Sequence, residues 1–230
     1  MKNQPIALKV LNVVTAILFL AALGMVFLYA PLEATMNYVQ KIFYFHIANA
    51  WVGMLGFIAA AVAGLIYLVK HDLKWDIVEL AAVEISLVFF FIAIVTGSIW
   101  ARPSWGTYWT WEPRLTTAAI LELVYLAYLL LRQGIDDPDR RARFSAVYTL
   151  IGAISVPITF VSIRLFRTIH PVVIGTNSSA TQGGFDMTSK MLVTMFFALF
   201  TFSIIFITLF WHRIRLGQLS HQLDQLKLEE

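Results

Sequence analysis

The chain has 230 residues, of which 59% are hydrophobic and only 13% are charged, and its mean hydropathy is +0.75. A soluble domain carries about 25% charged residues, so the composition excludes an ordinary soluble protein and indicates a chain folded in a bilayer. The lack of cysteine excludes disulfides and thiolate metal sites, and the net charge of +3, without a concentrated basic face, excludes nucleic acid as a partner.

Six apolar segments are long enough to be predicted as membrane-spanning helices. The first covers about 23 residues, or roughly 35 Å of helix, which exceeds the apolar core of about 7–15 residues in a secretory signal. We therefore expect a retained helix and a single six-helix domain over residues 1–230. The predicted spans are 8–30, 43–69, 78–100, 116–131, 144–162 and 191–211.

The distribution of Lys and Arg predicts the orientation of the chain. With the N-terminus inside, eleven of the 17 basic residues fall in inner segments and six in outer ones. The sequence thus predicts an all-α integral membrane protein with both termini cytoplasmic. A cytoplasmic tail, 212–230, follows the last span, and its leucines predict either a short amphipathic helix at the inner surface or against a partner, or a solvated helical tail. The leucines are Leu216, Leu219, Leu223 and Leu226.

The outer loop at 101–115, here called the Trp-rich loop, contains four aromatic rings within seven residues, Trp105 to Trp111. Rings with one apolar face and one polar tip settle where hydrocarbon meets water. A cluster this dense exceeds what anchoring a helix end requires. It predicts a flat aromatic surface for a large planar ligand.

Two of the five histidines lie on the same side as the Trp-rich loop by the parity of the spans. His46 is about one turn inside the outer end of the second span, and His170 follows the fifth span. Each taken singly is explained more simply as an interfacial or surface histidine. Neutral imidazole is a common axial ligand of haem iron, so the pair beside an aromatic surface favours a haem site. Arginines near it are candidates to bind the propionates: Arg102, Arg114, Arg164 and Arg167.

Residues 105–116 resemble the tryptophan-rich signature of the haem-handling membrane proteins of cytochrome c maturation, W-G-x-x-W-x-W-D-x-R-L-T. Glu112 stands where the pattern has Asp, which keeps the charge. Six spans in about 230 residues resemble the CcmC family within this group. The resemblance covers essentially the whole chain, from the histidine on the second span to the histidine in the third outer loop.

The resemblance implies a protein of the bacterial inner membrane that binds haem b (iron protoporphyrin IX) at the outer face and delivers it to the haem chaperone CcmE. The partners implied are the ABC-type complex CcmA/CcmB, the small protein CcmD and membrane lipid. His46 and His170 would be the axial ligands. No catalytic residue is expected, and whether the protein assists covalent attachment of haem to the chaperone stays open. The remaining haem-binding residues would be Trp105, Gly106, Tyr108, Trp109, Trp111, Glu112 and Arg114.

Three carboxyl residues fall within spans, where charge is costly. Glu79 is expected to reach the membrane interface, whereas Glu84 and Glu122 are expected to pair between helices or to relay protons. Such carboxyls keep a secondary transporter open as an alternative function, and a b-type cytochrome is the other alternative. Pro157 is expected to kink the fifth span. The stretch 175–184, rich in Gly, Ser and Thr, is interpreted as a lid hinge or a passive linker.

Overall fold

The computed structural model describes residues 4–166, 168–171 and 187–228, and these form helices and no sheet. Six helical stretches are long and apolar enough to cross a membrane, which confirms the predicted all-α, six-span, multi-pass membrane protein. Arg167 and the stretch 175–184 lie outside the described residues. The helices are α1 (Ile6–Gly24), α2 (Lys41–Lys70), α3 (Leu73–Trp105), α4 (Pro113–Gln133), α5 (Pro138–Gly152), α6 (Ser155–Leu165) and α7 (Ser189–Leu228), with two short helical turns, η1 (Met25–Tyr29) and η2 (Tyr38–Gln40).

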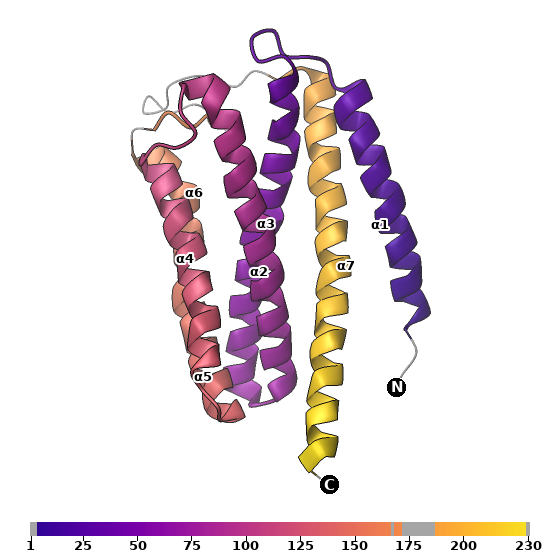
Figure 1. Cartoon of the computed structure of the whole chain (residues 1–230), viewed down its shortest axis with the longest axis vertical. Coiled ribbons are helices and arrows are strands. Elements are labelled where there is room, and N and C mark those ends of the chain that lie inside the picture. Colours follow the sequence, from indigo (N-terminus) through magenta and orange to yellow (C-terminus); the bar gives the residue numbers. More distant parts are fainter. Residues whose placement is uncertain (1–3, 167, 172–186, 229–230) are drawn as a thin grey trace.

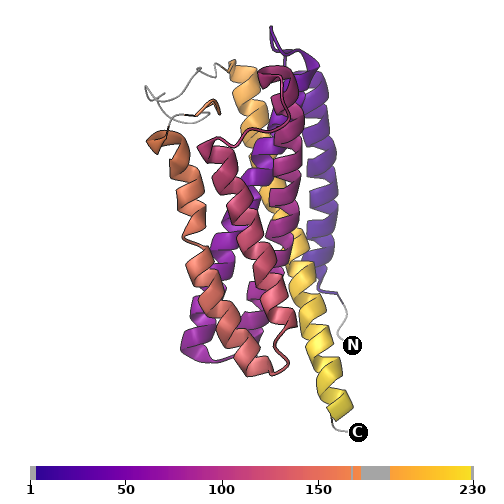
Figure 2. The same ribbon diagram turned by 60° about the vertical axis from the view of Figure 1, so that its left-hand side comes forward.

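The helices run along one common axis (Figure 1). Both ends of the chain lie at one end of the bundle, and the turn between α3 and α4 lies at the other. α2 and α3 form the centre, where they pack against each other and against α5 and α7, while α1 packs only against α7 among the described helices. The C-terminal part of α7 extends past the other helices in both views (Figure 2).

Small residues allow α2 to approach α3 closely, which is how helices associate without a hydrophobic driving force in lipid. Gly56, Ala60 and Gly64 recur at every fourth residue and therefore lie on one side of α2. A Cβ at Gly56 would lie 1.9 Å from Ser86 Oγ, and one at Gly53 would lie 2.9 Å from Phe90 Cβ. The backbones are therefore in contact at a distance that only glycine permits.

The predicted fifth span consists of two helices, α5 and α6, with a break at Ala153 and Ile154. Pro157 has no N–H to donate to the carbonyl of Ala153, four residues earlier. That carbonyl instead accepts from the N–H of Val156 at 3.2 Å, as in a tighter turn. The expected kink at Pro157 is thus a break placed one turn before the proline.

Two helix boundaries differ from the predicted ones. α3 continues to Trp105 and ends at Gly106, whose φ of +76° is the left-handed conformation of a helix C-cap. Glu112 caps the next helix and Pro113 begins it, so the connection between α3 and α4 is shorter than the expected 101–115. The tail expected as a separate amphipathic helix continues α7 without interruption to Leu228.

The charged residues within the spans are mostly paired. Glu84 of α3 forms an ion pair with Arg213 of α7, and Lys41 donates from Nζ to the carbonyls of Val26 and Ala30 at 2.7 and 2.8 Å. The expectation that Glu79 reaches the interface is wrong, because its side chain is 0% exposed. Helices α2, α4 and α5 cover it.

Replacement of Gly56 by leucine tests the α2–α3 contact. We expect Gly56→Leu to lower the free energy of unfolding by about 1–3 kcal/mol because the larger side chain must force the helices apart. The matched control is Gly24→Leu, since nothing lies within 4 Å of a Cβ at Gly24. Thermal unfolding in detergent measures the difference, and equal losses in the two variants would contradict this packing.

Candidate haem site

The two histidines each use Nδ1 for a backbone carbonyl. His46 Nδ1 lies 2.8 Å from the carbonyl oxygen of Ala93 on α3, and His170 Nδ1 lies 3.1 Å from that of Pro171. A carbonyl only accepts hydrogen bonds, so Nδ1 carries the proton in each ring and Nε2 carries the lone pair. This is how a second partner orients a metal-ligating histidine.

The fold brings these histidines together although 124 residues separate them in the sequence. Their ring centroids are 6.4 Å apart, with an angle of 45° between the planes. The ring of Trp105, at the end of α3, meets His170 edge-on at 6.2 Å. The pair therefore lies beside the C-terminal end of α3, and the turn from α3 to α4 lies at the end of the bundle away from the termini (Figure 1).

A cavity of about 510 Å³ adjoins both imidazoles. Helices α2, α3, α4, α6 and α7 all contribute to its wall. The indole N–H of Trp109 is buried and has no hydrogen-bond partner among the described residues. The residues of its wall that matter for chemistry are His46, Trp100, Trp105, Trp109, Arg114 and His170.

The motif residues do not all face this cavity. Trp105, Trp109 and Arg114 line it, whereas Tyr108 is 60% exposed and Trp111 is 77% exposed. Gly106 serves as the left-handed C-cap of α3. The predicted site is therefore divided into a part that lines the cavity and a part that presents aromatic rings outward.

Glu112 joins the Trp-rich loop to the segment that carries His170. One carboxylate oxygen accepts from the N–H of Leu115 at 2.8 Å and so caps α4. The other accepts from the hydroxyl of Thr168. That hydroxyl oxygen in turn accepts from the N–H of His170 at 3.0 Å, so a single side chain holds both the start of α4 and the second histidine.

The cationic groups of the site are arginines. Arg114 donates to the carbonyl of Thr159 at 2.6 Å and lines the cavity, as does Arg164. Arg102 instead stacks over Tyr108 at 5.6 Å, away from the cavity. Burial, the charge of Arg114 and the neighbouring His46 lower the pKa of His170 to about 3, so His170 is neutral at physiological pH.

Sequence reasoning missed two residues that shape the site. A Cβ at Gly97 of α3 would lie 2.8 Å from His46 Cε1, so the absence of a side chain there makes room for the imidazole. Trp100 lines the cavity, meets Trp105 edge-on at 5.8 Å and donates from Nε1 to Gln40 at 3.4 Å. A single glycine or tryptophan within an apolar span carries no pattern that would have distinguished either residue.

Comparison with known proteins identifies the family. The profile of the family described as Heme exporter protein C (CcmC) matches residues 2–229. The chain belongs to the CcmC family. It is 36% identical over 200 residues to the heme exporter protein C of Bradyrhizobium diazoefficiens, covering 86% of this chain and 74% of that protein.

Other CcmC relatives match over shorter regions. The heme exporter protein C of Escherichia coli strain K12 is 34% identical over 142 residues, which cover 62% of this chain and 58% of that protein. A putative cytochrome c biosynthesis ccmC-like mitochondrial protein of Marchantia polymorpha is 32% identical over 175 residues, 75% of this chain and 72% of that protein. The chain is thus similar both to bacterial heme exporter proteins C and to a protein named as mitochondrial.

The double role of Glu112 generates a stability prediction. Glu112→Ala removes the N-cap of α4, which costs about 1 kcal/mol, and it also leaves the Thr168 hydroxyl without its acceptor. Glu112→Gln keeps an acceptor oxygen and is the matched control. We expect thermal unfolding to show a clear loss for the alanine variant and a small one for the glutamine variant. An alanine variant as stable as the wild type would be incompatible with this capping.

Proposed function

We propose that this protein binds haem between His46 and His170 at the outer face of the bacterial inner membrane and delivers it to the haem chaperone CcmE. The observation that carries the proposal is the convergence of these two imidazoles, from distant parts of the chain, beside one cavity. The family description and the names of the relatives support haem as the cargo and cytochrome c maturation as the process.

The geometry of the histidines suits a metal ion held between them. With metal–imidazole bonds of about 2 Å, two imidazoles on opposite sides of one ion have ring centres roughly 6 Å apart. The observed separation is 6.4 Å. Because Nδ1 of each ring is committed to a carbonyl, Nε2 is the ligating atom in both.

The cavity wall suits the rest of a haem b molecule. Trp100, Trp105 and Trp109 supply aromatic surface for the porphyrin. Arg114 is the cation placed to bind a propionate, since a guanidinium matches a carboxylate in shape and charge. The buried N–H of Trp109, without a partner among the described residues, is a further donor for a polar group of the cargo.

The outward-facing aromatic rings suit a protein partner. Tyr108 and Trp111 are exposed beside the cavity, and aromatic residues are enriched where proteins bind one another. We assign them to the surface that contacts CcmE. The excess of Lys and Arg in the predicted inner segments supports cytoplasmic termini and an outward-facing site. CcmA, CcmB and CcmD are the other partners that family membership suggests.

The alternatives, a secondary transporter and a b-type cytochrome, receive less support from the described residues. A transporter places its site near the bilayer midplane between broken helices, whereas His170 lies beside both His46 and Trp105, the last residue of α3. A b-type cytochrome usually holds its haem with histidines on membrane-spanning helices. His170 instead lies in the third outer segment, which is not a predicted span. We therefore retain haem binding and delivery.

An absorption spectrum tests the ligand pair directly. We expect the purified protein, supplied with haem, to show a low-spin spectrum in the oxidised and the dithionite-reduced states, because two imidazoles give a strong axial field. His46→Ala and His170→Ala should each convert it to high-spin or abolish it. His221→Ala, far along α7, is the control. A low-spin spectrum that survives in both site variants would refute the axial assignment.

A second prediction concerns the position of His46 rather than its chemistry. Gly97→Ala places a Cβ 2.8 Å from the imidazole and should displace the ring, which we expect to weaken haem binding about tenfold, or roughly 1.4 kcal/mol. Gly24→Ala, where nothing lies within 4 Å, should leave it unchanged. Haem titration followed by absorbance measures the affinity of both variants. An unchanged affinity in Gly97→Ala would contradict the prediction that haem binding depends on the position of the His46 imidazole.

A further inference from the structure

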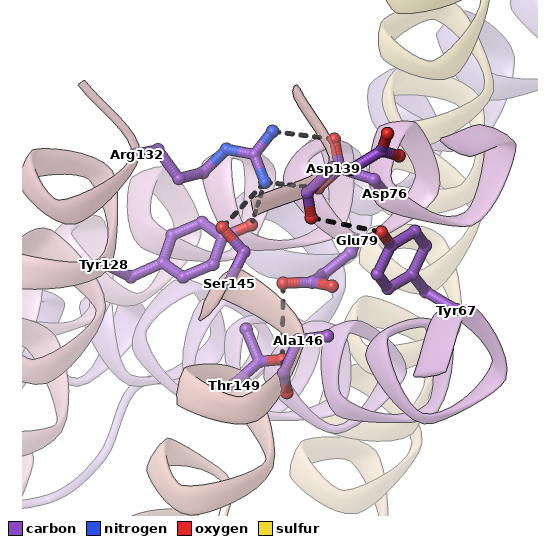
Figure 3. A network of polar contacts seen from close by, with 9 residues as sticks. All are labelled: Tyr67, Asp76, Glu79, Tyr128, Arg132, Asp139, Ser145, Ala146 and Thr149. Atoms are coloured by element: carbon purple, nitrogen blue, oxygen red, sulfur yellow. Dashed lines mark hydrogen bonds and ion pairs between the residues drawn. The ribbon is translucent and has the colours of Figure 1, made fainter. Parts of the chain in front are cut away.

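A buried polar cluster occupies the opposite end of the bundle from the histidines, near the α2–α3 and α4–α5 turns (Figure 3). We call it the Arg132 cluster. Its side chains come from α3, α4 and α5, and α2 closes one side with Tyr67. Its members are Asp76, Glu79, Tyr128, Arg132, Ser145 and Thr149.

Within this cluster one positive charge is matched by one negative charge. The guanidinium of Arg132 donates to both carboxylate oxygens of Asp76, at 2.5 and 2.8 Å. It also donates to the hydroxyls of Ser145 and Tyr128, at 2.9 and 3.4 Å. In such a bidentate ion pair, two parallel hydrogen bonds join the guanidinium to both oxygens of the carboxylate. Asp76 and Arg132 therefore neutralise each other.

Among the described residues Glu79 forms no ion pair, and Arg132, the cation whose charge reaches it, is already paired with Asp76. One of its oxygens accepts from the hydroxyl of Thr149 at 3.3 Å. The other, Oε2, is buried and has no hydrogen-bond partner among the described residues. Oε2 lies against the backbone of Gly64, and a Cβ added at Gly64 would be 3.0 Å from this oxygen. An ionised carboxylate in this position would be an uncompensated buried charge, which costs far more than a neutral acid.

The groups that face Glu79 from each neighbouring helix do not supply a positive charge beyond Arg132. α2 contributes Tyr67, and α3 contributes Asp76, which is itself acidic. α5 contributes the hydroxyl of Thr149 and, at the edge of the cluster, that of Ser145. From α4 come Tyr125, Arg132 and Tyr128, whose hydroxyl also interacts with the carboxyl of Glu79.

We propose that Glu79 is a proton-binding site, which holds its proton at neutral pH and so keeps the Arg132 cluster electrically neutral. A metal ion does not suit the place, because Ca²⁺ requires six to eight oxygens and the described residues contain no group of three or more His, Cys, Asp or Glu arranged for a metal. A proton needs only the one carboxyl.

Glu79 lies nearer to one end of the bundle than to the other. Glu79 lies six residues after the start of α3, or roughly 9 Å along the helix. Asp76, one turn nearer that end, is 7% exposed. On the other side, toward the histidines, an apolar layer that includes Phe57, Val83 and Leu121 closes the interior. Glu79 is therefore closer to the Asp76 end of the bundle than to the histidines.

The test compares Glu79→Gln with Asp76→Asn in the full-length protein. Glutamine has the shape of the protonated acid, so Glu79→Gln should unfold at a temperature no lower than the wild type at neutral pH. Asp76→Asn leaves Arg132 without its counter-charge and should unfold at a clearly lower temperature. The infrared absorption of a protonated carboxyl C=O, which shifts in D₂O, should be present in the wild type and reduced in Glu79→Gln.

The pH dependence gives a second readout. If Glu79 keeps its proton when folded and loses it on unfolding, the wild type binds more protons in the native state. Its stability therefore falls as pH rises from about 4, where an exposed glutamate titrates, and the fall ends where the folded carboxyl also loses its proton. Glu79→Gln should lack this part of the decline. A Glu79→Gln variant that is destabilised like Asp76→Asn or fails to fold, or a wild type in which the C=O absorption assigned to Glu79 is missing, would overturn the proposal. Haem binding is not needed for any of these measurements.

Discussion

The close packing of α2 against α3 is the contact on which the rest of the molecule depends. Glycines at 53 and 56 bring the two backbones together, and the same approach places the imidazole of His46 within 2.8 Å of the Ala93 carbonyl. Gly97 then leaves room for the ring. In lipid, where apolar contact alone does not hold helices together, one run of close packing thus both stabilises the bundle and orients the first histidine.

The two histidines are held in different ways. His46 lies on a continuous helix at the centre of the bundle, whereas His170 follows α6, the second half of a broken span. Its position depends on Thr168 and, through Thr168, on Glu112 in the Trp-rich loop. Trp111, the most exposed ring of that loop, directly precedes Glu112. A partner that binds at Trp111 would therefore be connected, through Glu112 and Thr168, to the segment that carries His170.

Much of this architecture could be predicted because bilayer spans are encoded in local hydropathy, and parity alone placed His46 and His170 at one end. Side-chain direction is different, because it depends on helix register and neighbouring helices. For that reason the sequence did not separate Trp109, at the cavity, from Trp111, which faces outward. The burial of Glu79 was missed for the same reason: three other helices, not its own sequence neighbourhood, remove it from water.

The two polar regions obey one electrostatic constraint, that charge inside the bundle must be matched locally. Near the histidines, the guanidinium of Arg114 donates to the carbonyl of Thr159 and the carboxylate of Glu112 acts on its charge. In the Arg132 cluster the pair with Asp76 is complete, so a further carboxyl is tolerated only if it is neutral. The apolar layer around Phe57 and Leu121 separates the regions, so each must balance its own charge. The guanidinium near the histidines borders a cavity, whereas that of Arg132 is enclosed among hydroxyls and the carboxylate of Asp76.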